Sequence, residues 1–223
     1  FENYIVRLER ENALPRIVIS TYDGDSHEVS FDEAAYALGM DAGYEYDTSV
    51  IRFSYESPST PEQTFDYDMS SRTRTLLKTQ EVPSGHDPSL YAVERIEATG
   101  EGGAKIPVTI LRLKGTPTDG SAPALLYGYG SYGYATSASF STNILPLVDR
   151  GAVYAIAHIR GGADKGRQWY LDGKLDKKMN TFTDFNAAAE ALIDKGYTSV
   201  GRIVSYGGSA GGLLVGASVP EAW

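Results

Sequence analysis

One serine of this chain lies in a glycine-rich run that few local folds can accommodate, Gly207-Gly208-Ser209-Ala210-Gly211-Gly212. The run follows the short apolar segment 202–206 and precedes a second apolar stretch, so Ser209 lies where a buried strand passes into a helix. A turn of this kind, the nucleophile elbow, holds its serine in a strained backbone conformation and needs very small neighbours two positions away on each side. Gly207 and Gly211 occupy those positions. We predict that Ser209 is a catalytic nucleophile, with a glycine-rich turn of no catalytic role as the alternative.

A nucleophilic serine needs a general base, usually a histidine oriented by an aspartate. In α/β-hydrolases both partners follow the serine in the chain, but no His or Asp follows Ser209 here. The chain has three histidines, and His158 stands at the end of a predicted buried strand. We predict a hydrogen-bonded structural role for His158 and surface roles for His27 and His86. The 223 residues alone are therefore expected to be catalytically incomplete.

A second glycine-rich stretch, residues 127–133, follows the apolar segment 124–126. One interpretation is a flexible loop of turn-forming residues. The other is an oxyanion loop that supplies one hydrogen-bond donor to a tetrahedral intermediate, while the amide of Ala210 supplies the second. The stretch has neither the Gly-Lys-Ser/Thr of a phosphate-binding loop nor the dinucleotide-binding spacing. We therefore expect no cofactor and no metal.

The first 78 residues contain short alternating apolar and polar segments separated by turn residues. Five segments are expected to be strands, at 4–9, 16–20, 50–55, 64–69 and 74–78. Short strands at this spacing are typical of antiparallel sandwiches, barrels and propellers. Because 78 residues are too few for a whole propeller, we predict only its C-terminal blades in this region, 1–78.

After the polar, turn-rich segment 79–87 the pattern changes to that of an α/β layer with a mostly parallel sheet. The helix expected there begins at Thr183 and ends near Gly196, because Phe185 and the apolar residues after it recur at helical spacing. The expected strands are 91–96 and 106–111, which form a hairpin, then 124–127, 153–157 and 202–206. We therefore predict a second domain over 79–223.

Composition excludes several classes of function. With 20 Lys and Arg against 29 Asp and Glu the net charge is −9, which argues against binding to nucleic acid or to anionic membranes. No stretch approaches the roughly 18 apolar residues of a membrane span. The absence of cysteine excludes disulfides and thiol catalysis. We expect a cytoplasmic protein, or a periplasmic one if a signal was removed, and a chain that is a piece of a longer polypeptide.

Six ordered blocks resemble the prolyl oligopeptidase family, and within it they are most similar to oligopeptidase B. The blocks are Leu126 to Gly133, Ala157 to Gly162, Gly166 to Tyr170, Gly173-Lys174, Asn180 to Phe185 and Gly207 to Gly212. The segment 78–87 fits the same subgroup, and the resemblance extends from Phe1 to Val219.

This resemblance implies a seven-bladed β-propeller that caps an α/β-hydrolase domain, and a serine endopeptidase that cleaves short peptides after Arg or Lys. By position, Ser209 is the implied nucleophile, and the oxyanion donors are the backbone N–H of Ala210 and the phenolic O–H of Tyr129. The family's triad Asp and His lie beyond Val219, so the remainder of the same polypeptide is an expected partner. The implied fold of this chain is an α/β-hydrolase fold that stops after the nucleophile elbow, preceded by propeller blades.

Two segments depart from the family pattern. Residues 136–139 contain no carboxylate, whereas members that prefer basic residues often carry carboxylates in this loop, and residues 220–223 differ from the usual continuation. The alternatives are a carboxylesterase or an acyl-aminoacyl peptidase on the same fold, and a non-catalytic interaction module formed by the β-rich part.

Overall fold

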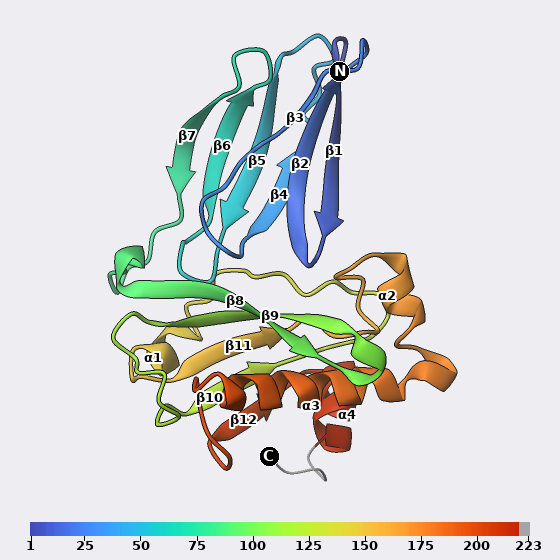
Figure 1. The fold of residues 1–223 in the computed structure, drawn as a ribbon. Helices are drawn as coiled ribbons and strands as arrows, with labels where there is room; N and C mark the ends of the chain where they lie inside the picture. The colour runs from blue at the N-terminus through green and yellow to red at the C-terminus, as the bar shows by residue number, and fades with distance from the viewer. Residues whose placement is uncertain (219–223) are drawn as a thin grey trace.

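The computed structural model describes residues 1–218, which form two parts that lie one above the other in Figure 1. The first part consists of two antiparallel sheets. One has the order β1-β2-β3 and the other β4-β5-β6-β7. Their bounds are β1 Tyr4–Glu11, β2 Leu14–Thr21, β3 Ser26–Glu28, β4 Ala37–Asp41, β5 Val50–Glu56, β6 Gln63–Asp68 and β7 Thr73–Thr79. The five strands expected here are confirmed, and β3 and β4 are additional.

The core of the first part lies between these two sheets. Ile17 and Ile19 of β2 and Ile51 and Phe53 of β5 are all buried, at two-residue intervals along their strands. Because successive side chains of a strand point to opposite faces, this spacing places all four on inner faces. Alternating hydrophobicity, the signal that predicted these strands, is thus the physical cause of the packing of one sheet on the other.

The second part contains a five-stranded mixed sheet with the order β12-β10-β11-β9-β8. Its strands are β8 Tyr91–Thr99, β9 Lys105–Leu113, β10 Ala124–Tyr127, β11 Val153–Ala157 and β12 Ile203–Tyr206. β8 and β9 form the expected hairpin, β9 pairs antiparallel with β11, and β10 pairs parallel with both β11 and β12. The parallel strands end at one edge of the sheet, which is where open α/β sheets bind ligands.

The helices of the second part are α1 Leu145–Val148, α2 Arg167–Leu171, α3 Met179–Asp194 and α4 Ala210–Ser218. The longest, α3, lies along the sheet (Figure 1) and buries Phe185, Ala188, Ala189 and Leu192, whose spacing predicted it. α3 begins four residues before the predicted start. The cause is tertiary: the Thr181 hydroxyl donates to the carbonyl oxygens of Arg160 at 2.8 Å and Gly173 at 3.1 Å.

The turn between β1 and β2 reaches the second part of the molecule. Asn12 and Ala13 both have left-handed backbone, with φ of 49° and 66°. The Ala13 amide donates to the Asp164 carbonyl oxygen at 2.8 Å, and the Arg95 guanidinium donates to the Asn12 carbonyl oxygen. The two parts thus make polar contacts, although no sheet of the described residues is shared between them. The domain boundary expected after residue 78 stays a prediction.

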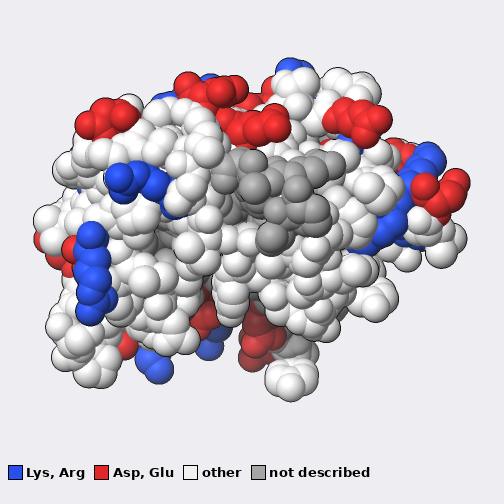
Figure 2. Space-filling model, turned by 90° about the horizontal axis from the view of Figure 1, so that it is seen from below, with Lys and Arg blue, Asp and Glu red and all other residues white. Residues whose placement is uncertain are grey.

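Charged side chains are dispersed on the face seen in Figure 2, where Lys and Arg stand as separate groups among Asp and Glu. Among residues 1–218 no helix has the length and apolar character needed to cross a membrane. Residues 219–223, which include the departure at 220–223, lie outside the described residues.

Candidate active site

Ser209 stands between β12 and α4, as the sequence predicts. Its φ is +56°, in the left-handed region that residues with a side chain rarely adopt. The residue is exposed, and within residues 1–218 its hydroxyl has no hydrogen-bond partner. The strained turn therefore presents an accessible, unpaired hydroxyl at the carboxyl edge of the sheet.

Two glycines of this turn are required by close backbone packing. A Cβ added to Gly207 would lie 2.5 Å from the Gly211 carbonyl oxygen and 3.0 Å from that of Gly128. A Cβ added to Gly211 would lie 2.9 Å from the same Gly128 oxygen, whereas one on Gly208 would meet nothing within 4 Å. The glycines two positions before and after Ser209 are therefore sterically necessary, while Gly208 is not.

The loop that carries Tyr129 lies beside this turn. β10 and β12 are parallel neighbours with Tyr127 opposite Tyr206, and the Gly128 amide extends the pairing by donating to the Tyr206 carbonyl oxygen at 3.2 Å. A Cβ on Gly211 would lie 3.7 Å from Cδ2 of the Tyr129 ring, so this ring adjoins the first turn of α4. The structure thus brings Tyr129 close to the elbow, and the oxyanion role of its phenol stays a prediction.

Ala210 is the first residue of α4. Its amide is therefore among the N-terminal donors that have no acceptor inside the helix. The N-terminal end of a helix also favours negative charge. An oxygen that becomes anionic beside Ser209 would meet both effects, which is the chemistry expected of an oxyanion site.

His158 has the predicted structural role. It is 1% exposed, its Nε2 lies 2.9 Å from Thr109 Oγ1, and its Nδ1 lies 3.0 Å from Asp164 Oδ1. Its carbonyl oxygen accepts a hydrogen bond from Trp169 Nε1 at 3.0 Å. Since both ring nitrogens have buried partners, His158 has no free nitrogen to take a proton from Ser209.

The other two histidines are half-buried, and the surface roles expected for them stay predictions. His27 Nε2 lies 3.1 Å from the Tyr67 hydroxyl, and His86 Nε2 lies 2.6 Å from the Ser59 carbonyl oxygen. His86 also stacks on Tyr91, with 5.1 Å between ring centroids. Both rings are held by packing in or against the β-rich part.

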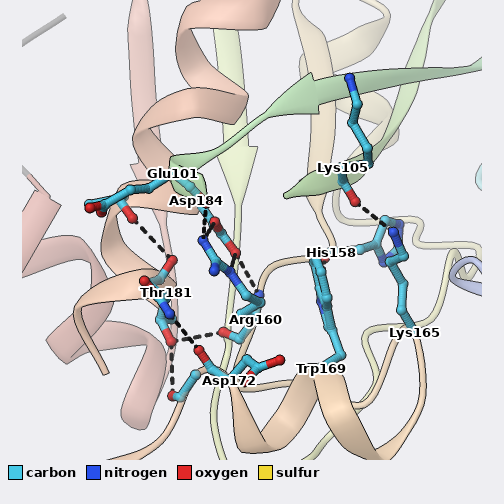
Figure 3. Close-up of polar contacts among 12 residues, drawn as sticks. Glu101, Lys105, His158, Arg160, Lys165, Trp169, Asp172, Thr181 and Asp184 are labelled. Carbon is cyan, nitrogen blue, oxygen red and sulfur yellow. Dashed lines mark hydrogen bonds and ion pairs between the residues drawn. The ribbon is translucent and has the colours of Figure 1, made fainter. Parts of the chain in front are cut away.

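A buried ion pair, which sequence reasoning missed, supports the candidate site (Figure 3). Asp184 of α3 has no exposed surface, and it accepts from Arg160 Nε at 2.8 Å, from Arg160 Nη2 at 2.6 Å and from the Arg160 amide at 3.0 Å. The hydrogen bonds to Asp184 raise the pKa of Arg160 above its ordinary value. This pair fixes the loop after β11 to the first turns of α3.

The same loop packs backbone to backbone against the Tyr129 loop. A Cβ on Gly161 would fall on the Gly130 carbonyl oxygen, and a Cβ on Gly173 would fall on the Gly161 amide nitrogen. Three loop segments, far apart in the sequence, are thus in contact through their main chains. The ion pair of Arg160 and Asp184 holds the middle segment and, through it, the loop that carries Tyr129.

The fold and this turn define an α/β protein with a serine at the elbow after a parallel strand, and comparison with known proteins identifies its family. A model described as "Prolyl oligopeptidase family" matches residues 138–222, and one described as "Prolyl oligopeptidase, N-terminal beta-propeller domain" matches residues 1–80. The chain belongs to the prolyl oligopeptidase family. Its described part combines β-propeller strands with the beginning of an α/β-hydrolase domain, which confirms the expected fold class.

Individual relatives agree with this assignment. Dipeptidyl aminopeptidase BI of Pseudoxanthomonas mexicana is 46% identical over 97% of this chain and 30% of its own length. Protease 2 of Moraxella lacunata is 42% identical over 97% of this chain and 31% of its own length. The structure of oligopeptidase B from Leishmania major matches with a TM-score of 0.90 and 38% identity, over 99% of this chain and 32% of that one. The chain thus spans about a third of the length of each of these three proteins.

The buried pair gives a first prediction. Replacing Asp184 with Ala leaves the Arg160 guanidinium buried without its counter-charge, so we expect a loss of about 3–5 kcal/mol in the free energy of unfolding. A matched control is Asp66→Ala, because Asp66 forms a similar two-point pair with Arg52 in an exposed position. That change should cost about 0–1 kcal/mol. Denaturant unfolding of both variants measures the difference, and equal losses would contradict the prediction.

The packing of main chain on main chain gives a second prediction. Gly173→Ala should lower the free energy of unfolding by about 1–3 kcal/mol, because the added methyl group can be accommodated only by moving the Gly161 backbone. Gly115→Ala is the control, since its Cβ would meet nothing within 4 Å and the change should stay within about 0.5 kcal/mol. Thermal unfolding of the two variants provides the comparison; a neutral Gly173→Ala would show that the loops are not tightly packed.

Proposed function

We propose that the polypeptide carrying this chain is a serine endopeptidase that cleaves short peptides, with a preference for bonds that follow Arg or Lys. Ser209 is the nucleophile, and the Asp and His of its triad come from the remainder of the same polypeptide. The observation that carries the proposal is the strained, exposed Ser209, packed through Gly207 and Gly211 against the loop of Tyr129. An interaction module gives no reason for this arrangement.

In the proposed reaction, Ser209 Oγ attacks the carbonyl carbon of the scissile peptide bond while the histidine takes the hydroxyl proton. The carbonyl oxygen becomes an oxyanion and accepts hydrogen bonds from the Ala210 amide and the Tyr129 hydroxyl. The intermediate collapses as the histidine returns the proton to the leaving amine, which leaves an acyl-enzyme. Water then attacks the ester by the same route and restores the Ser209 hydroxyl.

Two considerations bear on substrate class. The likeness to oligopeptidase B and Protease 2 supports a peptidase, and cleavage within the chain after Arg or Lys rests on the oligopeptidase B resemblance. The name of the 46% identical relative, a dipeptidyl aminopeptidase, favours a second candidate that releases dipeptides from a free N-terminus. Peptides with one Arg bond, offered with free or blocked N-termini, distinguish these activities, because only an endopeptidase cleaves both forms.

The identity of the nucleophile is tested in the complete polypeptide. A fluorophosphonate probe should form a covalent adduct on Ser209, located by peptide mass spectrometry, and Ser209→Ala should abolish both labelling and cleavage of Arg-containing peptides. Ser205→Ala is a nearby control, since Ser205 lies within β12 rather than at the elbow. Labelling elsewhere, or cleavage that survives Ser209→Ala, would remove Ser209 from its role.

The role of the phenol is tested separately. Tyr129→Phe removes one oxyanion donor and keeps the ring, so we expect kcat to fall by about 10²–10³ with little change in KM. Tyr134→Phe is the matched control, because its ring packs edge-on against Tyr129 at 5.5 Å but is assigned no donor role. Steady-state kinetics with an Arg-containing peptide measures both, and an unchanged kcat in Tyr129→Phe would exclude the phenol as a donor.

A further inference from the structure

Lys178, directly before α3, has an environment unusual for a lysine. Its ammonium donates to the Gly130 carbonyl oxygen at 2.6 Å and contacts Ser131 Oγ at 2.9 Å. The side chain is half-buried, makes no ion pair among residues 1–218, and lies 5.7 Å from the centre of the Phe182 ring. Burial lowers the pKa of Lys178. Burying a cation without a counter-charge is unfavourable, so the two loop contacts are its main compensation.

Both contacts fall on the residues that follow Tyr129. Gly130 has φ of +64°, and a Cβ there would lie 2.8 Å from Ile159 Cδ1, so this residue has little room to move. The Gly130 carbonyl oxygen packs against the Gly161 backbone and accepts the hydrogen bond of the Lys178 ammonium. The peptide group between Gly130 and Ser131 is therefore held by two neighbouring segments.

The start of α3 does not need these contacts for its own anchoring. Thr181 donates to two carbonyl oxygens of the neighbouring loops, and Asp184 is bound by three nitrogens of Arg160. Both anchors lie within the first two turns of α3. The Lys178 ammonium instead reaches the loop that leaves β10.

We propose that Lys178 is a positioning residue for the reaction: it fixes the peptide group between Gly130 and Ser131, and thereby the loop from which the Tyr129 phenol meets the oxyanion. This inference rests on the proposed function of Ser209 and Tyr129. A displacement of a catalytic group by about 1 Å can cost about 10²-fold in rate. The ammonium is suited to the task because two short hydrogen bonds to adjacent residues restrain the loop more than one would.

The test uses Lys178→Met in the complete polypeptide, because methionine keeps an unbranched side chain and removes the donors. We expect kcat to fall about 10- to 100-fold with KM within about twofold. Lys177→Met is the matched control: Lys177 is the preceding residue, is exposed and pairs with Asp172, so its kcat should not change. A Lys178→Met variant with wild-type kcat would overturn the proposal.

A double-mutant cycle with Tyr129→Phe separates positioning from a general structural effect. If Lys178 acts through the phenol, Lys178→Met should lower kcat by less than about twofold once Tyr129 is Phe. A loss of the same size in both backgrounds would show that Lys178 acts elsewhere, and the proposal would fail. Should circular dichroism show that Lys178→Met is unfolded, the cycle is run with Lys178→Leu, which also removes the donors.

The failure of this inference is distinguishable from failure of the proposed function. Fluorophosphonate labelling of Ser209 and the kcat loss of Tyr129→Phe report on the function in protein with Lys178 intact. When both are observed, the kinetics of Lys178→Met decide the positioning role alone. When neither the labelling nor the kcat loss is observed, the proposed function is wrong, and so is the positioning role of Lys178.

Discussion

The contact between the backbone of Gly128 and the backbone of the Ser209 turn is the constraint on which the candidate site depends. β10 and β12 are adjacent parallel strands, so the loops that leave them must share the space at one edge of the sheet. Glycine at 207 and 211 lets the main chains approach within the distance that a Cβ would occupy. Side chains at positions 207 and 211 would push the Gly128 backbone, and with it the loop of Tyr129, away from the turn.

The second requirement is that the Tyr129 loop stays where this contact places it. The loop rests on the backbone of Gly161, and Gly161 follows Arg160, whose side chain and amide are bound by the fully buried Asp184. A buried ion pair contributes little net stability, because desolvation of the charges offsets most of their attraction. Its effect here is to orient the loop. The Asp184 carboxylate accepts hydrogen bonds from three nitrogens of Arg160, and these bonds together fix how the loop lies against α3.

The sequence predicted those parts of the fold whose signal is local. The alternation of apolar and polar residues in β5, and the helical spacing of apolar residues from Phe185 to Leu192, each arise because one element packs a single face against the core. A short window of sequence is therefore enough to predict the element. The glycines around Ser209 were predicted for the same reason, since the turn and its requirement for small residues lie within six positions. The start of α3, the pair of Arg160 with Asp184 and the loop contacts of Lys178 were not predicted. Each depends on segments 21 to 48 residues apart, whose approach is decided by the folded chain.

Placement of the serine and its activation are separate physical problems in this architecture. The left-handed backbone of Ser209 is maintained by contacts among the described residues, namely the Gly128 loop, β12 and the first turn of α4. Activation needs a base with a free nitrogen, and His158 could become one only by breaking its buried hydrogen bond with Thr109 or with Asp164. Asp164 also accepts from the Thr136 amide, so the contact between His158 and Asp164 extends to the loop that follows Tyr134. The buried His158 therefore has a structural role. A base for Ser209 has to approach from the solvent-exposed side of the turn.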